Sequence, residues 1–351
     1  TAYEISTRDW SSDVCSSDLA IGGSAREIVF TSGATESNNL ALLGAASRRG
    51  ADRGHVITVA TEHHAVLDPI AQLEREGFGV TRLPVAPGTG LVDPDDVAAA
   101  MRPDTFLVSV MQANNEIGTI QDVAAIAARV HAHGAVMHVD CAQSLGRIEV
   151  QVDAIGADLA SFSAHKFHGP KGAGALFVRR RGRAVRVDPL VHGGGQERGM
   201  RSGTLDVPGI VGMAEAAGLA AADLPGEPAR LRGLRDRLWG LLQAAVPGMA
   251  LNGPPLDDPA VRLPNNLNVR MPGVDGQTLL AVLSGEGLAV SSGSACSSET
   301  PRPSHVLLAI GLGDDEARAS LRFGLSRFTT ADEVDRAAAV VAAGVSRLRA
   351  V

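Results

Sequence analysis

The chain has few cysteines and no long apolar run, and each shortage excludes a class of protein. Its three cysteines, Cys15, Cys141 and Cys296, lack the CxxC spacing of a zinc site and are too few and scattered for a disulfide framework. We therefore expect a reducing, cytoplasmic compartment and no resident metal. No apolar run reaches the roughly 18 residues needed to span a bilayer, and no basic-then-apolar leader opens the chain, so we expect no membrane association.

The chain also lacks an excess of positive charge, since its net charge is −7. Affinity for a nucleic-acid backbone depends on dense Lys and Arg, so this balance argues against a nucleic-acid partner and favours a small-molecule substrate. With 351 residues, of which 45% are hydrophobic, the chain can bury a sizeable core.

Residues 1–20 differ from the rest of the chain. They contain a repeated Ser-Ser-Asp unit and follow neither the helical nor the strand period. We interpret this segment as foreign to the protein, an artefact of cloning or sequence assembly, and a disordered native tail is the alternative. Cys15 therefore plays no part in the functional predictions.

From Glu27 onward, short apolar runs alternate with Ala-rich stretches of helical period, which predicts a mostly parallel sheet with helices on its faces. The predicted strands are 55–60, 79–83, 105–111, 135–139, 158–163 and 174–178. The predicted helices are 36–49, 64–76, 94–101 and 122–131, followed by one that begins near Asp206. Asp93 is the expected N-cap of the third helix, with Pro94 at its first position.

The composition shifts at 222–228, where Pro and Gly cluster. We predict a large α/β domain over 21–222 and a smaller α+β domain over 223–351.

Polar clusters follow several predicted strands, where open α/β sheets bind their ligands. The segment 30–39 ends a strand and opens a helix with small residues, which suits a phosphate or is a simple helix cap. Asp140 ends an apolar strand, so its carboxylate needs a cationic partner. A protonated pyridine nitrogen is one candidate, and a helix cap or structural ion pair is the alternative. Lys166 lies in a small-residue loop that suits a Schiff-base lysine as well as a solvated one.

Taken together, several motifs resemble the cysteine desulfurases, which belong to the class V aminotransferases within the fold-type I pyridoxal-phosphate enzymes. The matching runs occur in the order of the family from about Glu27 to the end of the chain. They are TSGATESNN, TEHHAVLD, NNEIG, HVDCAQS, SFSAHKFHGPKG, GGGQERGMRSGT and SSGSAC. The resemblance implies a large cofactor-binding domain with a sheet of the seven-stranded type and a small C-terminal domain that carries the cysteine loop.

The resemblance also implies a role for each matching residue. Lys166 corresponds to the lysine that holds pyridoxal 5'-phosphate covalently, Asp140 to the partner of the pyridine nitrogen, and Gln143 to a neighbour of the ring hydroxyl. His63 corresponds to the histidine that stacks on the ring, although a histidine at a strand end is more often structural. The expected phosphate-binding residues are Ala34, Thr35, Ser163 and His165, with Thr204 supplied by the other subunit of a homodimer.

Asn115 corresponds to a residue near the ring hydroxyl and the substrate carboxylate. Arg322 corresponds to the arginine that binds this carboxylate with two parallel hydrogen bonds, and an edge-strand arginine on a solvated face is the alternative. Cys296 lies in a Ser-Gly-rich stretch that suits a mobile, exposed thiol.

The expected reaction removes sulfur from L-cysteine and leaves L-alanine and a persulfide on Cys296. Lys166 moves the Cα proton, and His63 assists protonation. The persulfide would serve an acceptor or iron–sulfur scaffold protein, and Cys296 is the candidate ligand of a transferred cluster. A selenocysteine lyase or another class V transaminase is the alternative within the family, and an inactive, N-truncated sulfur-trafficking scaffold is the alternative outside it.

The sequence departs from the family pattern at two places. The opening strand and Ala-Thr-Thr segment of the family are absent where residues 1–20 stand, so we expect an incomplete and weakly active polypeptide. Ser and Gly are interchanged after Arg322-Phe323, which puts the local turn in doubt. Neither change touches Lys166 or Cys296.

Overall fold

The computed structural model describes residues 20–292 and 302–350, so the predicted non-native segment and Cys296 lie outside the described residues, except for residue 20 itself. The chain divides into two compact units. The first takes in the chain up to Leu83 and the segments 93–113 and 122–224. The second takes in the segments 84–92 and 114–121 and the whole chain from Pro225 onward.

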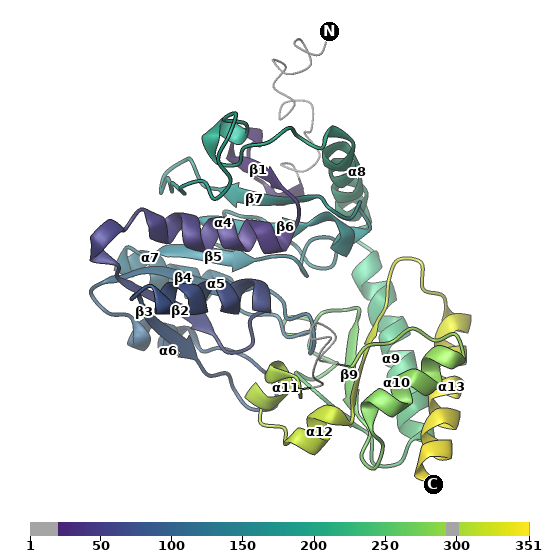
Figure 1. Cartoon of the computed structure of the whole chain (residues 1–351). Coiled ribbons are helices and arrows are strands. Elements are labelled where there is room, and N and C mark those ends of the chain that lie inside the picture. Colours follow the sequence, from purple (N-terminus) through teal and green to yellow (C-terminus); the bar gives the residue numbers. More distant parts are fainter. Residues whose placement is uncertain (1–19, 293–301, 351) are drawn as a thin grey trace. The chain divides into compact units, whose positions relative to one another are not determined.

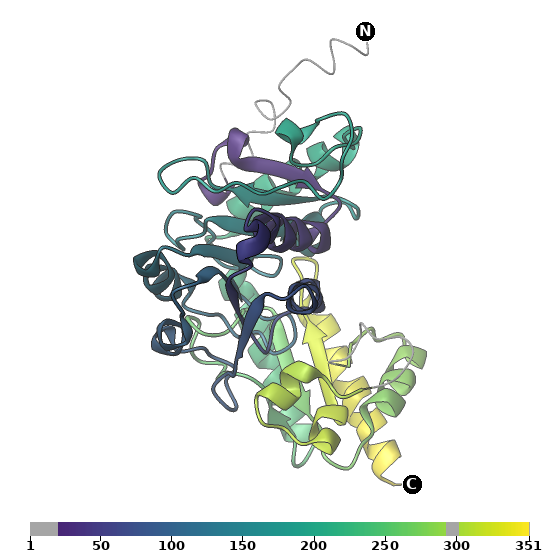
Figure 2. The same cartoon turned by 60° about the vertical axis from the view of Figure 1, so that its left-hand side comes forward.

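The sheet of the first unit has seven strands in the order β1-β7-β6-β5-β4-β2-β3 (Figure 1). The strands are β1 Ile28–Thr31, β2 His55–Val59, β3 Gly79–Leu83, β4 Thr105–Met111, β5 Val136–Asp140, β6 Leu159–Ser163 and β7 Gly174–Val178. Pairing is parallel from β3 through β2, β4 and β5 to β6, whereas β7 pairs antiparallel with both β6 and β1. Figure 2 shows β1, in purple, along the edge of the sheet beside β7. The prediction of a mostly parallel sheet is confirmed.

Helices cover both faces of this sheet, because right-handed crossovers that move in opposite directions along it put their helices on opposite sides. The helices are α4 Ala34–Ser47, α5 His64–Arg75, α6 Pro94–Ala100, α7 Val123–His133 and α8 Val207–Asp223. In Figure 1, α4 and α5 pack side by side in front of the strands, and α6 packs against α7. Asp93 caps α6 with Pro94 at its first position, as predicted.

The central strands of the first unit bury both of their faces. Every residue of β2, β6 and β7 is buried, which explains why apolar residues occupy consecutive positions in these strands and not only alternate ones. Each fully buried Val, Leu or Ile contributes about 1.5–3 kcal/mol of hydrophobic stabilisation. The carboxyl ends of the parallel strands are therefore held in a rigid frame.

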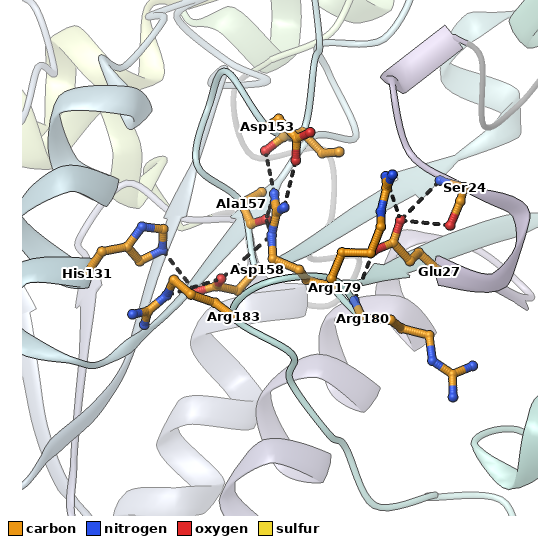
Figure 3. A network of polar contacts seen from close by, with 11 residues as sticks. Ser24, Glu27, His131, Asp153, Ala157, Asp158, Arg179, Arg180 and Arg183 are labelled. Carbon is orange, nitrogen blue, oxygen red and sulfur yellow. Dashed lines mark hydrogen bonds and ion pairs between the residues drawn. The ribbon is translucent and has the colours of Figure 1, made fainter.

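A polar network closes the opposite, amino-terminal ends of β5 and β6 (Figure 3). Asp158, just before β6, is fully buried, and its Oδ2 accepts from the N–H of Met137 at 2.9 Å. Three cationic or imidazole groups surround the same carboxylate: His131 Nε2 at 3.0 Å, Arg179 Nε at 3.8 Å and Arg183 Nε at 3.7 Å. Such compensation is what allows a carboxylate to be buried.

Four one-turn 3-10 helices complete the first unit: Ala25–Glu27, Gly50–Asp52, Ala164–Phe167 and Glu197–Gly199. The third of these carries Lys166, which the sequence placed in a loop; that prediction is corrected. The turn closes because the N–H groups of His168 and Gly169 both bond to the carbonyl of Ala164, with His168 in the left-handed conformation at φ 70°.

The second unit contains an antiparallel three-stranded sheet in the order β10-β9-β8. Its strands are β8 Ala250–Leu251, β9 Asn266–Arg270 and β10 Ser320–Gly324. Its helices are α9 Glu227–Ala245, α10 Gly276–Gly285, α11 His305–Ala309, α12 Asp314–Arg318 and α13 Ala331–Arg349. The core of this unit packs residues of α9, α10 and α13 against β9 and β10.

Candidate active site

The amino-terminal end of α4 offers two unoccupied backbone donors. The first backbone hydrogen bond of this helix runs from Ser37 N–H to the carbonyl of Gly33 at 3.0 Å. Among the described residues, the N–H groups of Ala34 and Thr35 find no acceptor. The helix begins two residues earlier than predicted, so both predicted phosphate-binding residues lie in its first turn. Free N–H groups and the helix dipole together favour an anion at this point.

Two glycines shape this helix start, Gly33 through its positive φ and Gly174, on β7, through close packing against Gly33. Gly33 has φ 151°, and a Cβ added to Gly174 would lie 2.4 Å from the Gly33 Cα. A Cβ on Gly33 itself would lie 3.5 Å from Ser163 Oγ. The end of β6 therefore lies directly beside the first turn of α4.

This contact brings the other two predicted phosphate-binding residues to the same place. Ser163 Oγ lies 3.0 Å from His165 Nδ1, and Ser163 is buried whereas His165 is exposed. Burial, together with the charges of Lys166, Lys171 and Arg147, lowers the pKa of His165, which keeps its imidazole neutral near pH 7. The geometry supplies hydroxyl, imidazole and amide donors, which suits a phosphate group.

Asp140 ends β5 as a buried carboxylate whose two oxygens each accept one hydrogen bond. Asn38 Nδ2, on α4, donates to Oδ2 at 2.8 Å, and the N–H of Ala142 donates to Oδ1 at 2.9 Å. Within residues 20–292 and 302–350 the carboxylate forms no ion pair. Burial raises its pKa despite both donors and the nearby charges of His63 and Lys166. The site is therefore short of one cation in contact with this carboxylate.

Lys166 is half-buried on its 3-10 turn, and its charge acts on both Asp140 and His63. A side-chain amine in such a place is partly desolvated, and it lies within electrostatic reach of Asp140 at the end of β5. The carbonyl of Lys166 accepts from Arg147 Nη2 at 2.8 Å. Arg147 Nη1 also donates to the carbonyl and to the side-chain Oε1 of Gln143, each at 3.0 Å. The two residues predicted to hold the cofactor from this side thus share one guanidinium.

His63 is the N-cap of α5 as well as a predicted site residue. Its Nδ1 accepts from the N–H of Ala65 at 3.0 Å, and burial lowers the pKa of its imidazole. The ring is therefore neutral near pH 7 with its proton on Nε2, and protonating it would break the cap. The structural role weighed for this histidine is present, and it leaves the ring's faces and Nε2 available for other contacts.

In the second unit, the two predicted substrate-binding residues touch each other. Arg322 lies on the edge strand β10, half-buried, and its Nη1 donates to the carbonyl of Asn115 at 2.9 Å. The other side of β10 is covered by Ser291, whose backbone exchanges two hydrogen bonds with Arg322, at 3.1 and 2.7 Å. Ser291 and Ser292 begin the Ser-Gly-rich cysteine stretch, so the chain enters that stretch beside Arg322.

The described structure does not test two of the predicted residues. Thr204 is exposed, and its role with a second subunit stays a prediction. Cys296 lies outside the described residues. The loop that carries Thr204 is tied to the phosphate end of the site, because Arg201 Nε pairs with Glu36 Oε1, on α4, at 2.8 Å.

The sequence reasoning gave no role to Asn38, Arg147 or the Glu36–Arg201 pair. Asn38 stands inside the TESNN motif, and its burial on α4 is the signal that could have found it. Arg147 follows Gln143 by four residues, a spacing at which side chains meet along a turn of helix. The pairing of Glu36 with Arg201 spans 165 residues, and no local pattern reports it.

No group of three or more His, Cys, Asp or Glu side chains among the described residues is arranged to hold a metal ion. In the same part of the chain, no single helix has both the length and the apolar composition to cross a membrane. The helices α8 and α9 meet that criterion only when they are taken together across the break between them.

Comparisons with known proteins agree with this geometry. The family model "Aminotransferase class-V" matches residues 18–337. The chain is 50% identical over 340 residues to the cysteine desulfurase IscS of Salmonella schwarzengrund, covering 96% of this chain and 82% of that protein. Among solved structures, a NifS-like protein superposes with a TM-score of 0.88 at 38% identity, covering 97% of this chain and 88% of the other. A structure described as SspA in complex with cysteine gives 0.77 at 36% identity, covering 93% and 89%.

Proposed function

The chain belongs to the class V aminotransferase family and, within it, to the cysteine desulfurases, and on this premise we propose that it binds pyridoxal 5'-phosphate and converts L-cysteine to L-alanine. The observation that carries the proposal is the buried Asp140, which has two hydrogen-bond donors and no ion-pair partner in the described residues, with the charge of Lys166 acting on it. A carboxylate in this state stabilises a protonated pyridine ring.

The residues of the first unit fit this cofactor in chemistry and arrangement. The unoccupied N–H groups of Ala34 and Thr35, with Ser163 and His165, would hold its phosphate. Asp140 would hold its ring nitrogen, Gln143 would lie at its ring hydroxyl, and Lys166 would hold it covalently. His63 would stack on the ring as a neutral imidazole. When bound, the cofactor supplies an electron sink for charge that develops on the substrate Cα.

The chain's own residues would orient the substrate and move its protons. Arg322 would bind the cysteine carboxylate with its guanidinium fork, and Asn115, whose carbonyl already holds Arg322, would set that fork's direction. Lys166 would take the proton from Cα. A proton delivered by His63 would come from Nε2, because Nδ1 is engaged with the N–H of Ala65.

The sulfur step would use Cys296 as the nucleophile. Its thiolate attacks the sulfur of the bound cysteine, forming an S–S bond while the Cβ–S bond breaks. The electron pair of the broken bond stays with the carbon skeleton, which takes up a proton and leaves as L-alanine. The reaction balances without an external oxidant, since the sulfur is oxidised as the substrate carbon is reduced. Cys296 is left as a persulfide.

We also propose that the protein acts as a homodimer and passes its sulfur to an acceptor or iron–sulfur scaffold protein. The exposed large apolar side chains of the first unit are Leu190, Val191, Val211 and Leu219. Contiguous apolar surface is typical of contact regions between subunits, and on this proposal these described side chains would lie in such a region. Thr204 is exposed, as a residue contributed to a partner's phosphate site must be.

The test replaces Cys296 by Ala and measures L-alanine released from L-cysteine. Release should fall to background while the cofactor stays bound, because Cys296 takes no part in holding it. Cys141→Ala is the matched control: this thiol is buried, and burial raises its pKa well above that of a free thiol, so it is no nucleophile and its loss should leave turnover unchanged. Undiminished turnover in the Cys296 variant would refute the sulfur step.

The same assay separates the rivals. Faster turnover of selenocysteine than of cysteine would favour a selenocysteine lyase, and amino-group transfer without sulfur release would favour another class V transaminase. An inactive scaffold would show no cofactor absorbance band at all.

A further inference from the structure

Arg147 joins the two residues that flank the proposed cofactor from the Lys166 side. It follows Gln143 by one turn of chain, and its Nη1 donates to both the main-chain and the side-chain oxygen of Gln143, each at 3.0 Å. Its Nη2 donates to the carbonyl of Lys166 at 2.8 Å. One planar guanidinium therefore fixes a side-chain amide and the 3-10 turn of the lysine relative to each other.

The bond to Oε1 decides which way the amide of Gln143 faces. A guanidinium only donates, so the atom that it contacts must be the amide oxygen. The Nε2 group, with its two donors, is then directed away from Arg147. A ring hydroxylate beside Gln143 needs such a donor, whereas an amide with the opposite orientation would present an acceptor and repel it.

The charge of Arg147 is unbalanced. All its hydrogen-bond partners among the described residues are carbonyl oxygens, and it forms no ion pair there. Burial lowers the pKa of its guanidinium to about 10, which still leaves it protonated near pH 7. A half-buried cation that lacks a counter-ion is costly, which suggests that it serves the groups around it.

We propose that Arg147 is a positioning residue for cofactor chemistry, one that orients the Gln143 amide toward the ring hydroxyl and holds the turn of Lys166 beside a positive charge. The inference rests on the proposed function and extends it to a residue that touches neither substrate nor cofactor. The charge of Lys166 acts on His63, Asp140 and His165, and the charge of Lys171 acts on His165 as that of Arg147 does. Of these, Asp140 opposes the effect of Arg147, and Lys171 reinforces it.

The experiment compares the wild-type protein with Arg147→Met, Arg147→Lys and the control Arg129→Met. Arg129 is exposed on α7, and it forms an ion pair with Asp95 on α6. Each protein is loaded with pyridoxal 5'-phosphate, and the absorbance band of the bound cofactor is followed against pH. Retention of the cofactor on dilution and thermal unfolding without cofactor are measured beside it.

In Arg147→Met, the midpoint of the absorbance change should move up by roughly half to one pH unit, because the loss of a nearby cation favours protonation at the lysine nitrogen. Retention should weaken about tenfold, as expected for lost charge-assisted hydrogen bonds. Arg147→Lys keeps the positive charge but loses the planar set of donors. Its midpoint pH should therefore lie close to that of the wild type, whereas its cofactor retention should lie between those of the wild type and Arg147→Met. Arg129→Met should match the wild type.

A folded Arg147→Met protein with wild-type midpoint and retention would overturn the inference. So would an Arg147→Lys protein whose midpoint equals that of Arg147→Met. Wild-type protein that shows no cofactor band would refute the proposed function instead, so the two failures are distinguishable. If Arg147→Met does not fold, the Arg147→Lys protein decides by the same two measurements.

Discussion

Two buried aspartates lie at opposite ends of neighbouring strands, and they differ in how their charge is balanced. Asp158, at the amino-terminal end of β6, lies within 4 Å of His131, Arg179 and Arg183. Asp140, at the carboxyl end of β5, accepts hydrogen bonds from the amide groups of Asn38 and Ala142 and from no other described residue. Both side chains are removed from water, and both belong to the same rigid sheet.

The difference separates a structural carboxylate from one that awaits a ligand. The chain itself neutralises Asp158, and the network of Figure 3 ties this group to the start of the sheet. At Asp140 the amides orient the carboxylate but do not cancel its charge, so burial raises its pKa. On the proposed function, a protonated pyridine ring would supply the cation that Asp140 lacks among the described residues.

The largest effect is expected for Asp140→Asn. The amide keeps the shape of the carboxylate but cannot hold a protonated ring nitrogen, so turnover of L-cysteine should fall by about 1000-fold or more. Thermal unfolding of the cofactor-free protein should not worsen. Steady-state kinetics measures the loss of turnover, and calorimetry on the same preparation measures the unfolding temperature. Retained turnover would contradict the role given to Asp140.

Asp158→Asn should show the reverse pattern. The amide weakens the hydrogen bonds that Asp158 accepts from Met137 and His131 and removes the negative charge beside Arg179 and Arg183, at a cost of about 2 kcal/mol in the free energy of unfolding. Turnover per folded molecule should stay close to wild type, because the group lies at the opposite ends of the strands from Lys166. Denaturant titration combined with kinetics would expose an error if activity fell while stability did not.

The pH dependence of cofactor-free protein sharpens the same contrast. Burial raises the pKa of Asp140 in the folded state, so the native protein binds more protons than the unfolded one between the two values. Stability therefore falls as pH rises through that window. Asn does not titrate, so Asp140→Asn should gain stability relative to wild type as pH rises above the unfolded-state pKa of about 4.

Glu27 provides the opposite sign as a control. Burial acts to raise its pKa, but the N–H of Arg180, the hydroxyl of Ser24 and the charge of Arg181 lower it overall. The stability that Glu27 contributes is fully present above its pKa in the unfolded state, and it is lost as pH falls through its lower pKa in the folded state. Glu27→Gln should therefore lose stability relative to wild type at neutral pH and match it in acid. If the stability difference from wild type changed with pH in the same direction for Asp140→Asn and Glu27→Gln, the opposite pKa shifts assigned to these two groups would be contradicted.

The smallest effect is expected for Asn38→Ala, which removes one of the two donors to Asp140. Cofactor retention should weaken about tenfold, in line with about 1–2 kcal/mol for a hydrogen bond to a charged group. In an Asp140→Asn background the same substitution should add little, because the charged acceptor is gone. An equal loss in both backgrounds would show that Asn38 acts on something else.

The sequence predicted the sheet, and it placed Asp140 and Lys166 after the ends of strands, because both features follow from local rules. Continuous apolar runs marked the buried parallel strands, and polar residues after them marked the carboxyl ends where Asp140 and Lys166 lie. Asp93 and Pro94 likewise located the start of α6 through a cap that involves only adjacent residues.

What the sequence missed depends on contacts between distant residues. The donor to Asp140 is Asn38, 102 residues away, and Arg322 meets Asn115 across 207 residues. Lys166 was placed in a loop because its small-residue surroundings carry no helical period, and the 3-10 turn comes from two N–H groups that share one carbonyl. Such features require the folded backbone, since each depends on which strands become neighbours.

The most direct test of the account asks which residue pyridoxal 5'-phosphate attaches to. The chain has only two lysines, Lys166 and Lys171. The loaded protein is reduced with borohydride and its peptides are analysed by mass spectrometry. We predict the reduced cofactor on Lys166 alone, with labelling greatly reduced in Asp140→Asn and unchanged in Lys171→Arg. Labelling of Lys171, or no labelling of the wild-type protein, would contradict the account.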